Sequence, residues 1–105
     1  MSPDQYMLNR IVRRVVATAH PLKIILFGSA TRGTFSKDSD LDLLVVVPDG
    51  TNRNRVARAI YRNMIGLLQP VDIVVATEND LRKHADNFSL IYYPALREGR
   101  ELYAA

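Results

Sequence analysis

An apolar segment that begins with two acidic side chains, residues 40–47, constrains the fold more than any other part of the chain. It reads Asp40-Leu41-Asp42-Leu43-Leu44-Val45-Val46-Val47 and is stopped by Pro48-Asp49-Gly50. This pattern predicts a strand that begins with two acids and ends purely apolar. Because residues two apart on a strand share a face, the carboxylates of Asp40 and Asp42 are expected to emerge side by side at its start.

Two further apolar runs predict that this strand belongs to a sheet. The expected strands are 23–27 and 71–76. Apolar residues at helical spacing predict a helix from Pro3 to about Ala19, with Ser2 as its N-cap. The order of the elements therefore predicts a small sheet with α-helices packed on it.

A second long helix is expected from about Asn52, ending at Pro70, with apolar positions at helical spacing as far as Leu68. Another side of this helix is basic, and basic residues on an amphipathic helix usually form its solvated face. The arginines of that side are Arg55, Arg58 and Arg62.

The C-terminal part is expected to be rich in helix. Residues 29–33 predict a brief helical turn, and residues 77–80 resemble a helix N-terminus with acids in its first turn. The tail 81–105 carries Gly99 as an expected C-cap and a short expected strand at 101–103. The tyrosines of the helices are expected to pack in the core or at an interface; they are Tyr61, Tyr92 and Tyr93.

Composition bounds the possible functions. The chain has 105 residues, 48% hydrophobic and 24% charged, as expected of one soluble domain, 1–105, with a single core. The longest apolar runs fall far short of the ~20 residues of a membrane span, and the expected compartment is the cytoplasm. The net charge of +3 suits an anionic ligand but is below what nucleic-acid binding alone would demand.

The pair of carboxylates points to a metal ion. Unpaired carboxylates held together repel each other, and a protein rarely keeps such a pair unless a cation lies between them. Oxygen ligands in a chain without cysteine favour Mg²⁺ or Mn²⁺ over Zn²⁺. Asp72, near the start of a later apolar run, is a third candidate ligand if its strand lies beside the first. Asp40, Asp42 and Asp72 together suit a two-metal site for phosphoryl displacement.

The motif Gly28-Ser29 supplies a complementary phosphate site. A glycine at a strand end lets the backbone approach a phosphate closely, and the Ser29 hydroxyl and the N–H groups of the next turn can donate to it. Arg32 lies one helical turn further on and can pair with a phosphate from the same side. Each signal is common when taken alone, and their combination is specific.

This combination resembles the nucleotidyltransferase superfamily that includes the palm of DNA polymerase beta. The resemblance rests on Gly28-Ser29, the ten residues 30–39, Asp40-Leu41-Asp42 and Asp72 in a later apolar strand. It covers about residues 21–76, and 27–45 is most similar to the minimal nucleotidyltransferase branch. It implies an α+β, polymerase beta palm-like fold with a small mixed β-sheet. It also implies transfer of a nucleoside monophosphate from a nucleoside triphosphate to a hydroxyl, with pyrophosphate leaving.

The resemblance also implies roles for individual residues. Asp40 and Asp42 match the metal-binding pair of the family, Asp72 matches its third carboxylate, and Gly28 and Ser29 match its triphosphate-holding motif. The metal implied is Mg²⁺ or Mn²⁺, and Arg32 is a further candidate for binding the nucleotide.

Minimal members that resemble this chain are commonly antitoxins. The resemblance therefore implies a helical HEPN-type toxin as partner and acceptor, a hetero-oligomer with it, ATP as the favoured triphosphate, and AMP transfer to a toxin tyrosine. No direct nucleic-acid target is expected. Two alternatives stay open: a non-catalytic protein that neutralises its partner by binding alone, and a nucleotidyltransferase for a small molecule.

Overall fold

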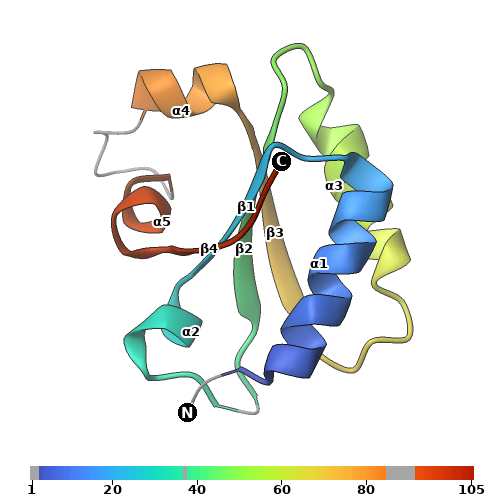
Figure 1. The fold of residues 1–105 in the computed structure, drawn as a ribbon, viewed down its shortest axis with the longest axis vertical. Coiled ribbons are helices and arrows are strands. Elements are labelled where there is room, and N and C mark those ends of the chain that lie inside the picture. The colour runs from blue at the N-terminus through green and yellow to red at the C-terminus, as the bar shows by residue number, and fades with distance from the viewer. Residues whose placement is uncertain (1–2, 37, 85–91) are drawn as a thin grey trace.

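Four strands form one mixed sheet in the computed structural model, which describes residues 3–36, 38–84 and 92–105. Its order is β3-β2-β1-β4 (Figure 1). Strand β2 pairs parallel with β3 and antiparallel with β1, and β1 pairs antiparallel with β4. The strands are β1 (Lys23–Phe27), β2 (Leu41–Val47), β3 (Val71–Thr77) and β4 (Arg100–Ala104).

Helices cover both faces of the sheet. Helices α1 and α3 pack together on one face, α4 and α5 lie on the other, and the short α2 follows β1 directly (Figure 1). Their bounds are α1 Gln5–Ala19, α2 Ser29–Arg32, α3 Arg53–Asn63, α4 Glu78–His84 and α5 Tyr92–Glu98. The expected α+β architecture is confirmed. Every helix in the described ranges is too short or too polar to cross a lipid bilayer.

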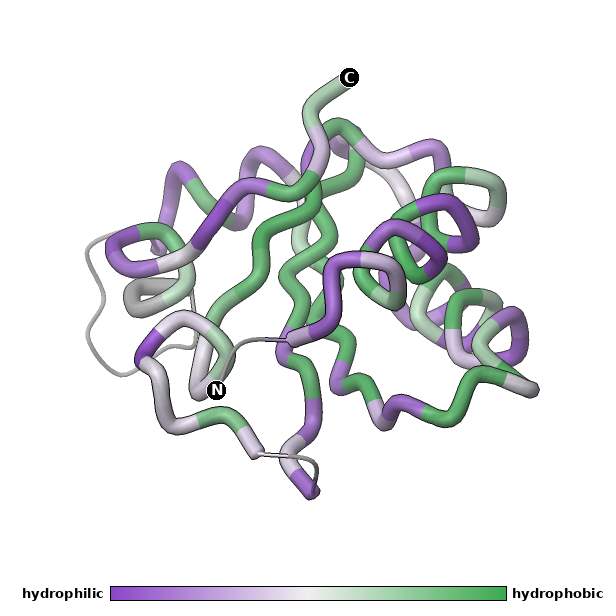
Figure 2. The backbone as a smooth tube through the Cα atoms, turned by 60° about the horizontal axis from the view of Figure 1, so that its bottom comes forward, coloured by the Kyte–Doolittle hydropathy of each residue, from purple (hydrophilic) through white to green (hydrophobic). Residues whose placement is uncertain are grey.

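The alternation of side chains along β2 divides the core in two. Residues such as Leu43 and Val45 pack in the cluster under α1 and α3, whereas Leu44 and Val46 pack in the cluster that includes Ala95 of α5. Figure 2 shows the resulting pattern, with hydrophobic strands at the centre and hydrophilic stretches concentrated in the outer helices. The strand expected at 40–47 is confirmed as β2, and it is buried on both faces.

The first helix begins later than its sequence suggests. The N-cap is Asp4, whose Oδ1 accepts a hydrogen bond from the Tyr6 N–H at 3.1 Å. The prediction of Ser2 as N-cap with Pro3 inside the helix is therefore wrong, and Ser2 itself lies outside the described residues. An aspartate caps as well as a serine, because either oxygen can satisfy a free N–H of the first turn.

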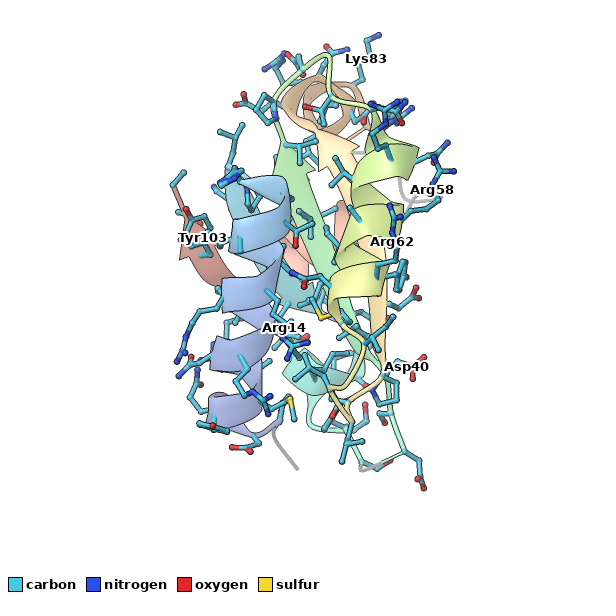
Figure 3. All side chains as sticks on the ribbon, turned by 90° about the vertical axis from the view of Figure 1, so that its right-hand side faces the viewer. Arg14, Asp40, Arg58, Arg62, Lys83 and Tyr103 are labelled. Carbon is cyan, nitrogen blue, oxygen red and sulfur yellow. The ribbon has the colours of Figure 1, made fainter. Side chains whose placement is uncertain are left out.

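The helix expected to reach Pro70 ends at Asn63. A series of turns follows, in which Gly66 has a φ of 95°, a backbone conformation that favours glycine. As a result Leu68, expected on the apolar side of this helix, lies in the loop with 93% of its surface exposed. The arginine side of α3 is exposed as expected, and Figure 3 shows Arg58 and Arg62 on its outer surface.

The remaining expected elements are present. The turn after β1 is α2, and the expected helix start at 77–80 is a reciprocal cap, since Thr77 N–H donates to Asp80 Oδ2 at 2.9 Å and Asp80 N–H donates to Thr77 Oγ1 at 3.1 Å. Gly99 follows α5 and leads into β4, which is longer than the expected strand at 101–103. The side chains of Tyr92 and Tyr93 lie outside the described part of the structure.

Side-chain hydrogen bonds connect the two long helices. Arg14 donates to the carbonyls of Asn63 and Ile65 at 2.9 and 3.1 Å, and so caps the C-terminal end of α3. Asn63 Nδ2 in turn donates to Thr18 Oγ1 at 2.6 Å and to the Arg14 carbonyl at 3.2 Å. The end of α3 is therefore fixed against α1 by groups of both helices.

Replacing Asn63→Ala removes both of its hydrogen bonds to α1. We expect the free energy of unfolding to fall by about 1 kcal/mol, which is a fall in Tm of roughly 4–8 °C for a domain of this size. Asn54→Ala is the matched control, because Asn54 is an exposed residue in the first turn of the same helix. Thermal unfolding followed by circular dichroism measures both, and equal Tm values for the two variants would contradict the assignment.

Candidate active site

The parallel register of β2 and β3 brings two aspartates together. Asp42 is the direct partner of Asp72 in the ladder, and both lie near the start of their strands. Asp40 immediately precedes β2 and is exposed at the same end of the sheet (Figure 3). The two strands are neighbours, as the prediction required. All three sequence-predicted acids therefore lie at one end of the sheet, which we call the acidic edge.

The loops before the two acidic strands are joined to each other. The Leu41 N–H donates to the Pro70 carbonyl at 3.0 Å, and Gln69 Nε2 donates to the Ser39 carbonyl at 3.1 Å. These bonds continue the pairing of β2 and β3 beyond the ladder itself. The backbone that carries Asp40 is therefore fixed relative to the backbone that carries Asp72.

Gly28 packs directly against one of the carboxylates. It follows Phe27, the ladder partner of Asp42, and has a φ of 76°. A Cβ atom built on Gly28 would collide with Asp42 Oδ2. Helix α2 starts at the next residue, Ser29, and Thr31 closes its first turn by donating from N–H and Oγ1 to the Gly28 carbonyl at 3.0 and 2.9 Å. Only glycine combines this backbone conformation with this contact.

The electrostatics of Asp42 reflect its crowded surroundings. Burial raises the pKa of the Asp42 carboxyl above its usual value, and the negative charges of Asp72 and Asp40 raise it further. The positive charge of Arg32 opposes this rise in the pKa. The predicted residues Gly28, Ser29, Arg32, Asp40, Asp42 and Asp72 are thus brought to one end of the sheet.

The acids at the other end of the sheet, in contrast, have arginine and backbone N–H partners. Asp49 accepts from the Asn79 N–H at 2.8 Å and from Arg82 at 3.2 Å, while Asp80 accepts from the Thr77 N–H and from Arg53. The backbone hydrogen bonds lower the pKa of both carboxyls. Within the described part of the chain, the three acids at the starts of β2 and β3 form no ion pair. Unlike Asp49 and Asp80, they are therefore available for a ligand.

Tyr61 of α3 reaches the third acid. Its hydroxyl donates to Asp72 Oδ1 at 3.2 Å and accepts from the Ile73 N–H at 2.8 Å. Burial, and after it the negative charge of Asp72, raises the pKa of the Tyr61 hydroxyl above 10. Tyr61 was expected to pack in the core or at an interface. It is instead 41% exposed, and that expectation did not include its contact with Asp72. Nothing in the sequence signals it, since the pairing depends on where α3 crosses β3.

The three acids are suitable ligands for a hard cation, but they do not form a complete coordination shell by themselves. In the residues that the structure describes, no three acidic or imidazole side chains converge on one point. Mg²⁺ usually takes one or two protein carboxylates and completes its shell with water and phosphate oxygens. Burial, and after it the charges of Asp72 and Asp40, raises the pKa of Asp42, and Arg32 offsets only part of this rise. The donor set therefore fits Mg²⁺ or Mn²⁺ that is held together with a phosphate ligand.

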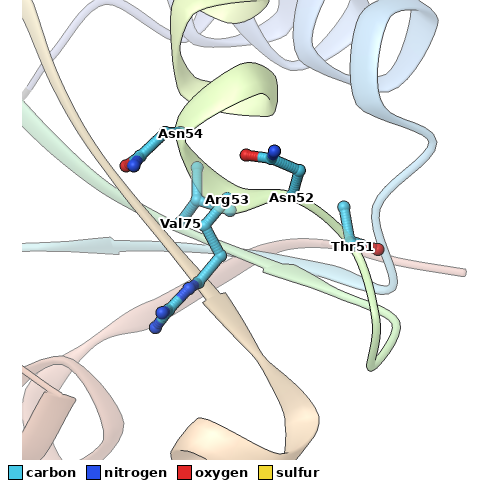
Figure 4. Close-up of a pocket in the computed structure, with 5 residues that line it drawn as sticks. All are labelled: Thr51, Asn52, Arg53, Asn54 and Val75. Carbon is cyan, nitrogen blue, oxygen red and sulfur yellow. The ribbon is translucent and has the colours of Figure 1, made fainter.

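A polar pocket at the other end of α3 is separate from these acids. It is lined by Thr51, Asn52, Arg53, Asn54 and Val75 (Figure 4). Asn52 is the N-cap of α3, accepting from the Arg55 N–H at 3.0 Å, and Arg53 pairs with Asp80. These groups serve the local fold, so the exposed acidic edge rather than this pocket is the candidate active site.

Comparison with known proteins identifies the fold and the family. The sequence profile of the nucleotidyltransferase domain matches residues 8–96. The chain belongs to this family. The matched range includes the glycine-serine motif and all three acids of the candidate active site. The resemblance that these residues predict is therefore confirmed, and the protein is a nucleotidyltransferase domain.

Solved structures share the fold of this nucleotidyltransferase domain. A crystal structure from Sulfolobus solfataricus, described as a nucleotidyltransferase, is similar with a TM-score of 0.64 and 20% identity over 94% of this chain and 78% of that one. A toxin–antitoxin structure with AMP-PNP has a TM-score of 0.65 and 24% identity over 93% of this chain and 73% of that one.

A toxin–antitoxin structure named MntA-HpeT, carrying two Asp-to-Glu substitutions, has a TM-score of 0.64 and 22% identity over 93% of this chain and 73% of that one. At these identities the likeness establishes a shared fold. No curated protein sequence matches the chain significantly.

Replacing Gly28→Ala in this domain is expected to displace the Asp42 carboxylate. The strained backbone and the collision together should lower the free energy of unfolding by about 2–3 kcal/mol. Gly33→Ala is the matched control, because Gly33 also has a positive φ, 77°, but has open space where a Cβ would lie, and it should cost about 1 kcal/mol. Urea unfolding measures both variants, and equal losses would show that the contact with Asp42 does not matter.

The raised pKa of Asp42 predicts a specific dependence of stability on pH. The folded state binds the proton of Asp42 more tightly than the unfolded chain, so the ionised group destabilises the fold above its folded pKa. In metal-free buffer Asp42→Asn should therefore be more stable than the wild type at pH 7. The difference should shrink as the pH falls through the Asp42 pKa and vanish below the ordinary value of 3.8.

Asp80→Asn provides the opposite control, because the native pKa of Asp80 is lowered. An ionised acid of this kind stabilises the fold above its unfolded pKa, so this variant should be less stable than the wild type at pH 7. Urea unfolding between pH 3 and pH 8 compares the three proteins. Destabilisation by Asp42→Asn at pH 7 would refute the electrostatic assignment.

Proposed function

We propose that this nucleotidyltransferase domain transfers AMP from ATP to a tyrosine hydroxyl of a helical HEPN-type toxin, and so acts as an antitoxin. The observation that carries the proposal is the half-buried Asp42, which packs against Gly28, lies opposite Asp72 and forms no ion pair with any residue in the described ranges. Carboxylates crowded together in this way favour a divalent cation that arrives with the triphosphate.

Asp40 and Asp42 would hold Mg²⁺ or Mn²⁺ on the triphosphate, and Asp72 would be the third carboxylate ligand. When bound, a divalent ion supplies neutralisation of the phosphate charge and orientation of the reacting oxygens. Because the backbones of β2 and β3 fix these acids relative to each other, the protein holds its ligands in place before the nucleotide arrives.

The strand-to-helix turn would bind the phosphates. Gly28 has no side chain, so a phosphate oxygen can approach its backbone, and the Ser29 hydroxyl and the N–H groups at the start of α2 are available donors. Arg32, whose charge already acts on Asp42, would neutralise charge on the leaving pyrophosphate.

The reaction exchanges the phosphoanhydride bond between the α- and β-phosphates of ATP for a phosphoester bond to the acceptor. The acceptor hydroxyl oxygen forms a bond to the α-phosphorus of ATP, the bond from that phosphorus to the bridging oxygen breaks, and pyrophosphate leaves with the electron pair. The hydroxyl proton would pass to a base at the site, and Asp72, an exposed carboxylate, would help to remove it.

The antitoxin role is supported by the structural neighbours. Two of them are toxin–antitoxin structures, one with AMP-PNP and the other with two aspartates replaced. The replaced aspartates of that protein are separated by one residue, as Asp40 and Asp42 are here. The partner, the base of the nucleotide and the acceptor tyrosine are parts of the proposal.

The proposal is tested with ATP labelled on either the α or the γ phosphate. The purified protein, its co-purified partner and Mg²⁺ are incubated with each label, beside the double variant Asp40→Asn, Asp42→Asn. We expect the partner to retain the α label but not the γ label, and the double variant to transfer neither. Mass spectrometry then identifies the acceptor residue and the nucleotide.

Other outcomes would redirect the assignment. Transfer from another triphosphate would change the base, and labelling of a small molecule would change the acceptor class. If a tightly bound partner is never labelled, and the double variant still neutralises it in cells, the domain acts by binding alone.

A further inference from the structure

We infer that Tyr61 is a positioning residue, which holds the carboxylate of Asp72 in the orientation needed for a divalent cation. This inference deepens the proposed function and rests on it only for the identity of the reaction. The contact to be explained is the hydrogen bond from the Tyr61 hydroxyl to Asp72 Oδ1, at 3.2 Å.

The direction of this hydrogen bond is fixed by a neighbour. The Tyr61 oxygen accepts from the Ile73 N–H at 2.8 Å, so the single hydroxyl proton remains for Asp72. Strand β3 is at the edge of the sheet, where an outward N–H has no neighbouring strand to pair with. The Tyr61 oxygen accepts a hydrogen bond from that N–H. This bond fixes the hydroxyl, which in turn orients the Asp72 carboxylate.

The base of the side chain is also fixed. The preceding residue, Ile60, is fully buried in the core beneath α3, and the helix end is held to α1 through Asn63. A tyrosine ring has only two side-chain torsions, so an anchored Cα and an anchored hydroxyl leave little freedom. The oxygen of Asp72 is thus located by a rigid connection that runs from the core of the protein.

The arrangement leaves a ligand position open. Tyr61 occupies Oδ1 of Asp72, while Oδ2 receives no hydrogen bond from any residue in the described ranges. Groups that donate hydrogen bonds to metal-ligating carboxylates orient them, and their removal typically costs 10–100-fold in metal affinity or activity. Neither Asp40 nor Asp42 has such a tyrosine partner among the described residues.

A tyrosine at this place could instead only join α3 to the edge of the sheet. That role would use the bond to Ile73 and would make the effect of Tyr61 independent of the Asp72 carboxylate. The two roles are separated by a double-mutant cycle, because a residue that acts through Asp72 has no further effect once that carboxylate is removed.

The test compares the wild type with Tyr61→Phe, which keeps the ring and removes the hydroxyl. Tyr6→Phe is the matched control, since Tyr6 lies on α1, is 66% exposed and has its ring beside the Arg10 guanidinium. The first readout is Mn²⁺ binding in the presence of a non-hydrolysable ATP analogue, followed by electron paramagnetic resonance of free Mn²⁺. It does not depend on turnover.

We expect Tyr61→Phe to weaken binding of the Mn²⁺ ion that depends on Asp72 by about tenfold or more, and Tyr6→Phe to leave that affinity unchanged. Asp72→Asn identifies this ion, and adding Tyr61→Phe to Asp72→Asn should weaken binding no further. In the transfer assay kcat should fall in parallel, while the KM for ATP stays within about twofold, because the triphosphate motif is intact.

Three results would overturn the inference. The first is unchanged Mn²⁺ binding in Tyr61→Phe. The second is an equal loss of Mn²⁺ affinity from Tyr61→Phe with and without the Asp72 carboxylate. The third is that Asp72→Asn weakens the binding of no Mn²⁺ ion. Failure of the proposed function looks different, since the wild type would then transfer no nucleotide while Tyr61→Phe still weakened Mn²⁺ binding.

Discussion

The parallel pairing of β2 with β3 holds together groups that charge alone would drive apart. Unit charges about 5 Å apart, the spacing of paired strands, repel by roughly 3 kcal/mol near a protein surface, whereas each fully buried Val or Leu stabilises the fold by about 1.5–3 kcal/mol. Every residue of β2 from Leu43 to Val47 is buried, so burial outweighs the repulsion between Asp42 and Asp72. The pairing also decides which loops, helices and glycines meet at the acidic edge.

The acids at the two ends of the sheet differ in their partners. At its far end, Asp49 and Asp80 are neutralised by arginines and backbone N–H groups and connect the turns to α4. At its near end the acids crowd a glycine and one another, and the pKa of Asp42 rises. The aspartates of the candidate active site are thus distinguished from those at the far end by their partners rather than by residue type or by exposure.

Much of this arrangement follows from local sequence rules. The run 40–47 predicts the strand that the structure shows, and the positions of Gly28 and Asp72 relative to it match a known family. The spacing of apolar residues did not mark the end of α3, because it continues past Asn63 to Leu68, through the turns that include Gly66.

The contact between Tyr61 and Asp72 was equally out of reach of sequence reasoning. It depends on which strand occupies the sheet edge and on the angle at which a helix crosses it. Local patterns predict elements and motifs, whereas contacts that cross between elements come from packing.

The bonds that join the loops before β2 and β3 also have a mechanical meaning. Through Leu41 with Pro70, and Ser39 with Gln69, the two loops behave as one body. An acceptor that presses on the exposed segment around Ile65 and Leu68 would therefore shift all three acids together rather than separate them. Because β1 pairs with β2 and Gly28 already touches the Asp42 carboxylate, the phosphate turn is held to the same body, and the acids and this turn would move as a unit.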